Sequence, residues 1–120
     1  MEYMILFNQP ERDLERTRDD ADSADYWESW RAYMSAVYSV GVVKGGNALQ
    51  PPYTATTIRI RDGKRQVHDG PYADTKELLG GYLIIDVESL DDALQWAARS
   101  PSSTTGSTEV RPVLPQRESS

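Results

Sequence analysis

A stripe of large apolar side chains between residues 25 and 40 most constrains how this 120-residue chain can fold. Its members recur every three or four residues: Trp27, Trp30, Met34, Val37 and Tyr38. This spacing places side chains along one face of an α-helix. We predict a helix from Asp25 to Val40, with Asp25 and Glu28 as its capping box. Gly41 suits the left-handed position just after the helix. We interpret the stripe as core, which requires a sheet to pack against.

The other apolar segments are short and favour strands. Gly80 to Val87 is nearly continuous in apolar residues, which is typical of a strand at the centre of a sheet. Ser89 to Arg99 then predicts a second helix, with Ser89 and Asp92 as its capping box. The remaining predicted strands are Tyr3–Phe7, a short one at Val42–Val43, Thr54–Arg61, Lys64–His68 and Thr108–Leu114. Because of Pro112, the last of these belongs at a sheet edge or a strand end. Residues 44–53 and 102–107 are predicted to be loops, and residues 11–24 are predicted to be a solvated loop or a frayed helix.

The strand predicted over Thr54–Arg61 alternates between two kinds of side chain. Thr56, Ile58 and Ile60 lie on one side of the pleat, and Thr57, Arg59 and Arg61 lie on the other. We expect this strand to be half buried. Asp62-Gly63 is a strong turn signal, so Lys64–His68 is predicted to return beside it as a hairpin.

The order of elements is strand, helix, hairpin, strand, helix, strand. This order predicts an α+β fold, a ferredoxin-like two-layer sandwich with both helices on one face of a mostly antiparallel sheet. If the other face carries residues such as Tyr82, Ile84 and Ile58, it needs a second cover. We therefore expect a homodimer that packs face to face. One domain is expected over residues 1–115, followed by a disordered tail over 116–120.

Composition limits the possible partners. The formal net charge of −6 argues against a general nucleic-acid or anionic-membrane surface, because such surfaces depend on clustered Lys and Arg. The absence of cysteine excludes disulfides, thiolate nucleophiles and zinc–thiolate sites, and one histidine offers little for other metals. No apolar run approaches the roughly 20 residues that span a bilayer. We expect a cytoplasmic protein without a metal site.

The most informative stretch for function begins at the single histidine. His68 directly precedes Asp69, Gly70, Pro71 and Tyr72, on a turn between two strand-like runs. A histidine exchanges protons near neutral pH, and a carboxylate in a partly buried dimer cleft can act as a general acid or base. His68 and Asp69 are therefore the candidate catalytic residues.

Four neighbours are candidate substrate-binding residues, and each also has a structural explanation. Gly70 and Pro71 shape the backbone. Tyr72 could line a pocket or lie in the core or dimer seam. Lys76 could bind an anionic substrate or be a solvated surface lysine. Likewise, an Asp before Gly-Pro is a common turn former, and a lone histidine is often exposed or hydrogen-bonded for structural reasons.

The segment Asp69–Tyr82, DGPYADTKELLGGY, resembles the DGPF-type signature of YCII-related proteins. Three more segments are similar to this family: residues 43–51, 87–93 and 107–113. The resemblance implies a dimeric α+β barrel, in which ferredoxin-like subunits pack sheet to sheet. It also implies either of two roles. Some members resemble lyases and dehalogenases that use a His–Asp pair without a cofactor, whereas the DGPF branch is often encoded near extracytoplasmic-function sigma factors.

Two functional hypotheses follow. In the first, the protein is a cofactor-free lyase or isomerase acting on a small molecule in the dimer cleft, with Asp69 moving the proton, His68 assisting and Tyr72 shaping the pocket. In the second, it is a non-catalytic binding or regulatory module associated with a sigma factor, and the motif builds the fold. The position of the Asp69 carboxylate, in a pocket or bonded to backbone amides, would separate the two.

Overall fold

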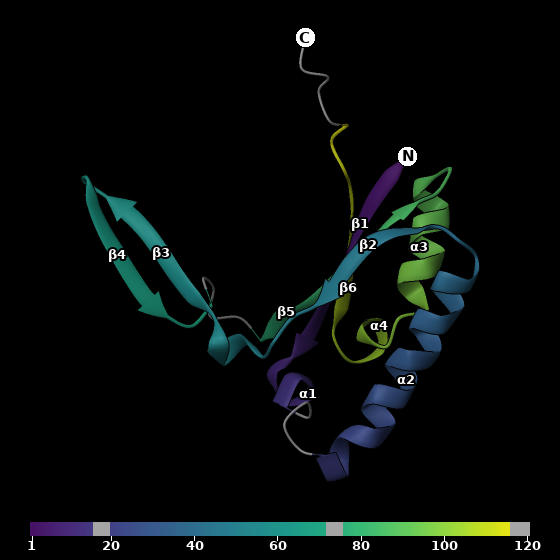
Figure 1. The fold of residues 1–120 in the computed structure, drawn as a ribbon, viewed down its shortest axis with the longest axis horizontal. Coiled ribbons are helices and arrows are strands. Elements are labelled where there is room, and N and C mark those ends of the chain that lie inside the picture. Colours follow the sequence, from purple (N-terminus) through teal and green to yellow (C-terminus); the bar gives the residue numbers. More distant parts are fainter. Residues whose placement is uncertain (16–19, 72–75, 116–120) are drawn as a thin grey trace.

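The computed structural model describes residues 1–15, 20–71 and 76–115. The elements in chain order are β1 (Glu2–Pro10), α1 (Glu11–Glu15), α2 (Asp20–Ser39), β2 (Val43–Ala48), the 3-10 turn η2 (Pro52–Thr54), β3 (Thr56–Arg61), β4 (Lys64–Asp69), β5 (Glu77–Asp86), α3 (Leu90–Ala98), α4 (Ser102–Thr105) and β6 (Ser107–Pro112). Four strands form one antiparallel sheet in the order β2-β5-β1-β6, and β3 and β4 form a separate hairpin (Figure 1). The predicted tail, residues 116–120, lies outside the described residues.

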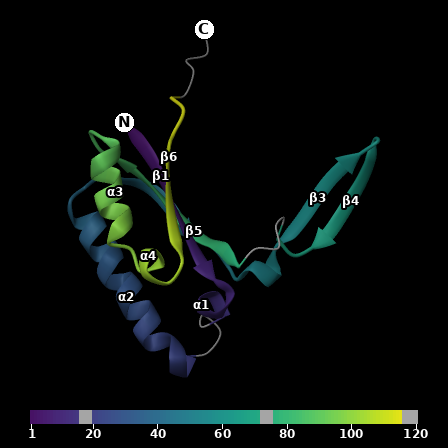
Figure 2. The same cartoon turned by 180° about the vertical axis from the view of Figure 1, so that it is seen from behind.

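The sheet has a helix-covered face and an open face. Tyr3, Ile5 and Phe7 of β1 point to the helices and are buried, with Ile5 fully so. In register with them, Leu83 and Ile85 of β5 are also buried. Because side chains alternate along a strand, the residues between them face the other way. The open face carries four partly buried side chains, Met4, Leu6, Tyr82 and Ile84. The helices α2 and α3 lie on one side of the sheet, and the β3–β4 hairpin projects on the opposite side (Figures 1 and 2).

Helix α2 is longer than the apolar stripe predicts. It begins at Asp20, so Asp25 lies inside the helix and the predicted capping box is wrong. The segment predicted as a loop or a frayed helix contains α1, whose Leu14 is only 4% exposed. This one buried leucine anchors an otherwise charged segment to the end of the sheet. The predicted left-handed position after the helix is confirmed, with φ of +77° at Gly41.

Helix α3 follows the sequence closely. The Ser89 hydroxyl accepts a hydrogen bond from the Asp92 amide at 3.2 Å, which is the predicted N-cap. Ala93 and Ala97 are buried against the sheet. The Tyr33 hydroxyl of α2 donates to the Trp96 carbonyl at 3.0 Å and joins the two helices. The next segment, predicted as a loop, includes the single turn α4.

Strand β2 is the main error in the predicted sheet. Val43–Ala48 pairs with β5, where a loop was predicted after residue 43. The glycines that suggested a loop allow a close backbone approach instead. A Cβ atom on Gly46 would lie 2.5 Å from the Tyr82 carbonyl oxygen, so no larger residue fits there without a shift.

The hairpin of β3 and β4, residues 56–69, is called the arm below. Its register runs from Thr56 opposite Asp69 to Arg61 opposite Lys64. The predicted turn is confirmed, with positive φ at both Asp62 and Gly63, as in a type I′ turn. The predicted half burial is wrong: the arm stands away from the four-stranded sheet, and nearly every residue in it is exposed. Ile58 is therefore not on the open face of the main sheet.

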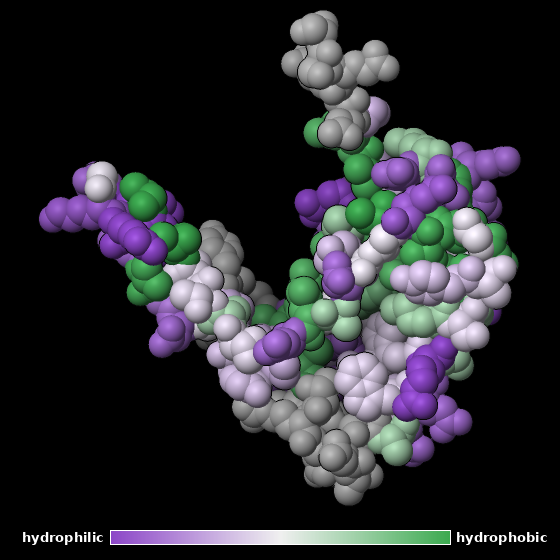
Figure 3. All heavy atoms as spheres, in the orientation of Figure 1, coloured by the Kyte–Doolittle hydropathy of each residue, from purple (hydrophilic) through white to green (hydrophobic). Residues whose placement is uncertain are grey.

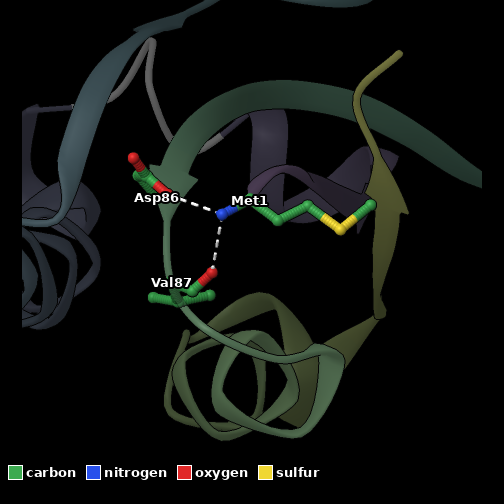
Figure 4. A network of polar contacts seen from close by, with 3 residues as sticks. All are labelled: Met1, Asp86 and Val87. Atoms are coloured by element: carbon green, nitrogen blue, oxygen red, sulfur yellow. Dashed lines mark hydrogen bonds and ion pairs between the residues drawn. The ribbon is translucent and has the colours of Figure 1, made fainter. Parts of the chain in front are cut away.

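The start of β1 is tied to the end of β5 (Figure 4). The Met1 amino group donates to the Asp86 carboxylate at 2.9 Å and to the Val87 carbonyl at 3.1 Å. The hydrogen bond from the positive amino group lowers the pKa of the Asp86 carboxyl. None of the described helices is long and apolar enough to cross a membrane.

Candidate functional site

A cavity of about 350 Å³ lies between α2 and the β2–β5 edge of the sheet, on the helix-covered face. The sheet contributes Phe7 and Leu83 to its walls, and α2 contributes Trp27, Trp30 and Met34. Ligand sites typically combine such apolar walls with a few placed polar groups. This cavity therefore has the general character of a small-molecule site.

The aromatic wall corrects the interpretation of the stripe as core. Trp30 is buried and packs edge-on against Phe7, with ring centroids 4.9 Å apart. One turn earlier, Trp27 is 37% exposed, and further along α2 Tyr38 is 54% exposed. Both line the cavity. Only part of the stripe fills the core, and the rest borders an accessible space. The Trp30 indole N–H is buried and has no acceptor among the described residues.

Two polar side chains form the floor of the cavity. The Gln9 amide donates to the Tyr26 hydroxyl at 2.9 Å, and this hydroxyl lies 3.2 Å from the Gln9 carbonyl oxygen. Gln9 is only 3% exposed, so this pairing satisfies a buried amide. A register shift between Phe7 and Asn8 leaves Gly80 without a partner on β1, and a Cβ atom there would lie 2.5 Å from Gln9 Oε1. Because Gly80 has no side chain, the Gln9 side chain has room to form the floor.

A single cation lies among the described residues that line the cavity. Arg31 is exposed, and it forms no ion pair with a described residue. Asn47 and Tyr82 lie opposite each other on β2 and β5, and the Asn47 amide donates to the Tyr82 hydroxyl at 3.0 Å on the open face of the sheet. An arginine beside aromatic rings suits a flat ligand that carries a negative group, because the rings stack on it and the guanidinium pairs with its charge.

The residues predicted as catalytic lie elsewhere. His68 and Asp69 are exposed at the base of the arm, and neither lines the cavity. They are adjacent on β4, so their side chains point to opposite faces of the arm and are not brought together. The Asp69 carboxylate makes no hydrogen bond or ion pair with a described residue, and His68 Nε2 lies 3.4 Å from the Pro71 carbonyl. Their catalytic role stays a prediction.

Of the predicted substrate-binding residues, Gly70 and Pro71 directly follow β4 at the base of the arm. The Gly70 amide donates to the Ala55 carbonyl at 2.7 Å, and the Gly70 carbonyl accepts from the Thr57 hydroxyl at 2.8 Å. With φ of +108°, this position requires glycine. These bonds close the base of the arm. Lys76 is exposed and does not line the cavity, and Tyr72 lies outside the described residues.

Sequence reasoning missed the cavity residues Gln9, Arg31 and Asn47. One signal was present: Arg31 stands four residues after Trp27 and three before Met34, so a cation interrupts the apolar face of the helix. Gln9 and Asn47 gave no such signal, because Gln9 is paired with Tyr26, which is distant in sequence, and Asn47 reaches the cavity only through the pairing of β2 with β5.

Comparisons with known proteins agree with this architecture. The family model of the YCII-related domain matches residues 1–117. An uncharacterised protein of Rhizobium meliloti (strain 1021) is 46% identical over 67 residues, and the match spans about half of each chain, 54%. Among solved structures, the 5-chloro-2-hydroxyhydroquinone dehydrochlorinase of Burkholderia phenoliruptrix AC1100, in complex with 2,5-dihydroxybenzoquinone, superposes with a TM-score of 0.54. It is 17% identical, and the alignment covers 95% of this chain and 94% of that one. The predicted α+β, ferredoxin-like fold of the dimeric α+β barrel class is confirmed.

Proposed function

This chain belongs to the YCII-related family, and from that premise we propose that it binds a small, ring-shaped molecule with a negative group in the cavity beside α2. One observation carries the proposal: aromatic walls and an exposed arginine without an ion-pair partner among the described residues meet in one cavity. The volume of about 350 Å³ lies at the small end of the range for ligand pockets, roughly 300–1,000 Å³. It suits a molecule with one ring.

The reaction that we propose is a cofactor-free lyase or isomerase step. The dehydrochlorinase with the same fold acts on a chlorinated hydroxyhydroquinone, and its structure holds a dihydroxybenzoquinone. Such compounds are flat rings with acidic hydroxyl groups, and they match the chemistry of this cavity. In this proposal Asp69 moves the proton and His68 assists, with Gly70, Pro71, Tyr72 and Lys76 bordering the substrate.

Catalysis by Asp69 requires a second subunit in this proposal, since Asp69 does not line the cavity of its own chain. The open face carries partly buried Met4, Leu6, Tyr82 and Ile84, and a second copy would cover it in a face-to-face homodimer. Asp69 pairs with Thr56 across the arm and so shares a face with Ile58 and Val67. In this proposal a partner packed beside that face brings its Asp69 carboxylate to the mouth of the cavity of this chain, where the carboxylate acts on the bound substrate.

A second candidate function is ligand binding without catalysis, as in a regulatory module. Two observations favour it: His68 and Asp69 are exposed, and neither of them lines the cavity. Both candidates share the same ligand site, and they differ only in whether Asp69 takes part.

Calorimetric titration with 2,5-dihydroxybenzoquinone and with monocyclic hydroxybenzoates tests the site. Arg31→Gln should weaken binding of the tightest probe by about tenfold, the equivalent of roughly 1.4 kcal/mol. Lys44→Gln is the control, because it changes the net charge equally and does not line the cavity. Equal weakening by both variants would mean that only overall charge matters, and no binding of any probe would contradict the ligand class.

Asp69→Asn separates the two candidate functions. In an enzyme it should abolish turnover of a bound probe, while binding through Arg31 and the aromatic walls of the cavity remains. Unchanged turnover would remove Asp69 from the mechanism.

A further inference from the structure

The arm has two chemically different faces. Alternation along both strands places the apolar residues Ile58, Ile60 and Val67 on one face, where Ile58 lies directly opposite Val67. The same face carries Thr56, Arg65 and Asp69 toward the two ends of the arm. These three side chains are 53%, 58% and 54% exposed. The other face carries the polar and basic residues Thr57, Arg59, Arg61, Lys64, Gln66 and His68.

An exposed apolar face on a two-stranded hairpin is physically unusual. A hairpin alone is marginally stable in water and gains stability by packing its apolar face on another surface. The described part of this chain provides no such surface, because the arm projects away from the body on the side opposite to α2 and α3 (Figures 1 and 2). Figure 3 shows hydrophobic side chains on the arm and on the body, on either side of an open notch.

We propose that this notch receives a second copy of the chain, and that each arm packs its apolar face against the body of the partner. The inference rests on the homodimer proposed above and adds the arm to its interface. Self-association suits the geometry, because the open face of the sheet borders the same notch and no described residue covers it. In a two-fold dimer each copy gives one arm and receives one.

Charge supports the partner being a second copy. The arm carries four basic and two acidic residues, a net charge of +2. The whole chain carries −6, so the remainder carries −8. The positively charged arm is therefore attracted to the negatively charged body of a partner, and salt should weaken this attraction.

A threonine triple variant tests the contact. Ile58→Thr, Ile60→Thr and Val67→Thr together keep the β-branched shape that suits a strand while removing apolar surface. In sedimentation equilibrium over a concentration series, the dissociation constant of the dimer should rise by about tenfold or more. Gln66→Thr, on the opposite face of the same strand, is the control and should leave the constant unchanged. The single variant Ile60→Thr should give a smaller shift in the same direction if the triple variant does not fold.

Hydrogen exchange provides a second readout. Arm amides of the wild-type protein should exchange more slowly at concentrations where the dimer dominates than after dilution to monomer. A triple variant with the wild-type dissociation constant, or arm amides that exchange at one rate at both concentrations, would overturn the role of the arm while leaving the homodimer intact. A wild-type protein that is monomeric at all concentrations would remove both.

Discussion

The Tyr26 hydroxyl lies within hydrogen-bonding distance of both polar atoms of the Gln9 side chain, 2.9 Å from Nε2 and 3.2 Å from Oε1. This pairing links α2 to β1 at the floor of the cavity. Because Gln9 is only 3% exposed, its amide has little access to water if the hydroxyl is removed. The floor is therefore both a structural and a ligand-facing feature.

Tyr26→Phe should lower the free energy of unfolding by about 1–3 kcal/mol, because it leaves a buried amide unsatisfied. Gln9→Leu in the same chain should restore part of the loss, since two apolar groups need no hydrogen bond. Urea denaturation of the two single variants and the double variant gives the coupling between them. Losses that simply add would show that the two side chains do not depend on each other.

Tyr33 should make the free energy of unfolding depend on pH in the alkaline range. Burial raises its pKa from 10.0 to about 12, against an opposing effect of the Arg99 charge. The folded protein therefore holds this proton more tightly than the unfolded chain does. The resulting stability is fully present below pH 10 and is lost as the pH rises through about 12.

Tyr33→Phe should remove this dependence and, through loss of the hydrogen bond to the Trp96 carbonyl, cost about 0.5–1.5 kcal/mol at neutral pH. Ultraviolet titration of tyrosinate, with urea midpoints measured between pH 8 and 11, checks both effects. The variant Tyr38→Phe is the control, because Tyr38 is 54% exposed. Parallel stability curves for wild type and Tyr33→Phe would contradict the prediction.

Two glycines offer a matched comparison of close packing. A Cβ atom on Gly106 would lie 2.2 Å from the Asn8 carbonyl oxygen, whereas one on Gly45 would meet nothing within 4 Å. Gly106→Ala should therefore destabilise the fold by about 2 kcal/mol or more, because backbone must move. Gly45→Ala should change stability by less than about 0.5 kcal/mol. Thermal unfolding followed by circular dichroism measures both effects. Similar unfolding midpoints for the two variants would show that β6 can shift to accommodate the added methyl group.

The two tryptophans of the cavity wall should separate binding from stability. Trp30 is 8% exposed and Trp27 is 37% exposed. Trp30→Ala should cost about 3–5 kcal/mol of stability, as truncation of a buried aromatic usually does. Trp27→Ala should cost much less, yet weaken binding of an aromatic probe by about tenfold. Calorimetry and denaturation on the same samples would show whether the exposed ring serves the ligand.

Local signals in the sequence correctly predicted the start of α3, the turn of the arm and the central strand of the main sheet. Ser89 capped α3, Asp62-Gly63 formed the turn, and the apolar run before Asp86 became a sheet strand with neighbours on both sides. In each case neighbouring residues decide the conformation. The errors arose where distant contacts decide it: β2 depends on the approach of Gly46 to the Tyr82 backbone, and α1 depends on the burial of Leu14.

The cavity was harder to predict for the same reason. Its floor joins Gln9 to Tyr26, and its walls come from α2, β1, β2 and β5, so no single stretch of sequence contains a site pattern. The arm shows the converse case. Its alternating pattern correctly predicted two different faces, but a pattern of this kind does not tell whether the apolar face is covered within one chain or between chains.

Gly80, which has no partner on β1, has a further consequence for how ligand preference could change in this fold. A methyl group there would press on Gln9 and on Leu14, whose Cδ2 would lie 2.8 Å away, and would raise the bottom of the pocket. The residue at position 80, where the register of β1 and β5 shifts, thus sets how deep a ligand can enter the cavity. Substitution at this position would change the size of ligand that fits, while the aromatic walls and Arg31 would still contact the ligand.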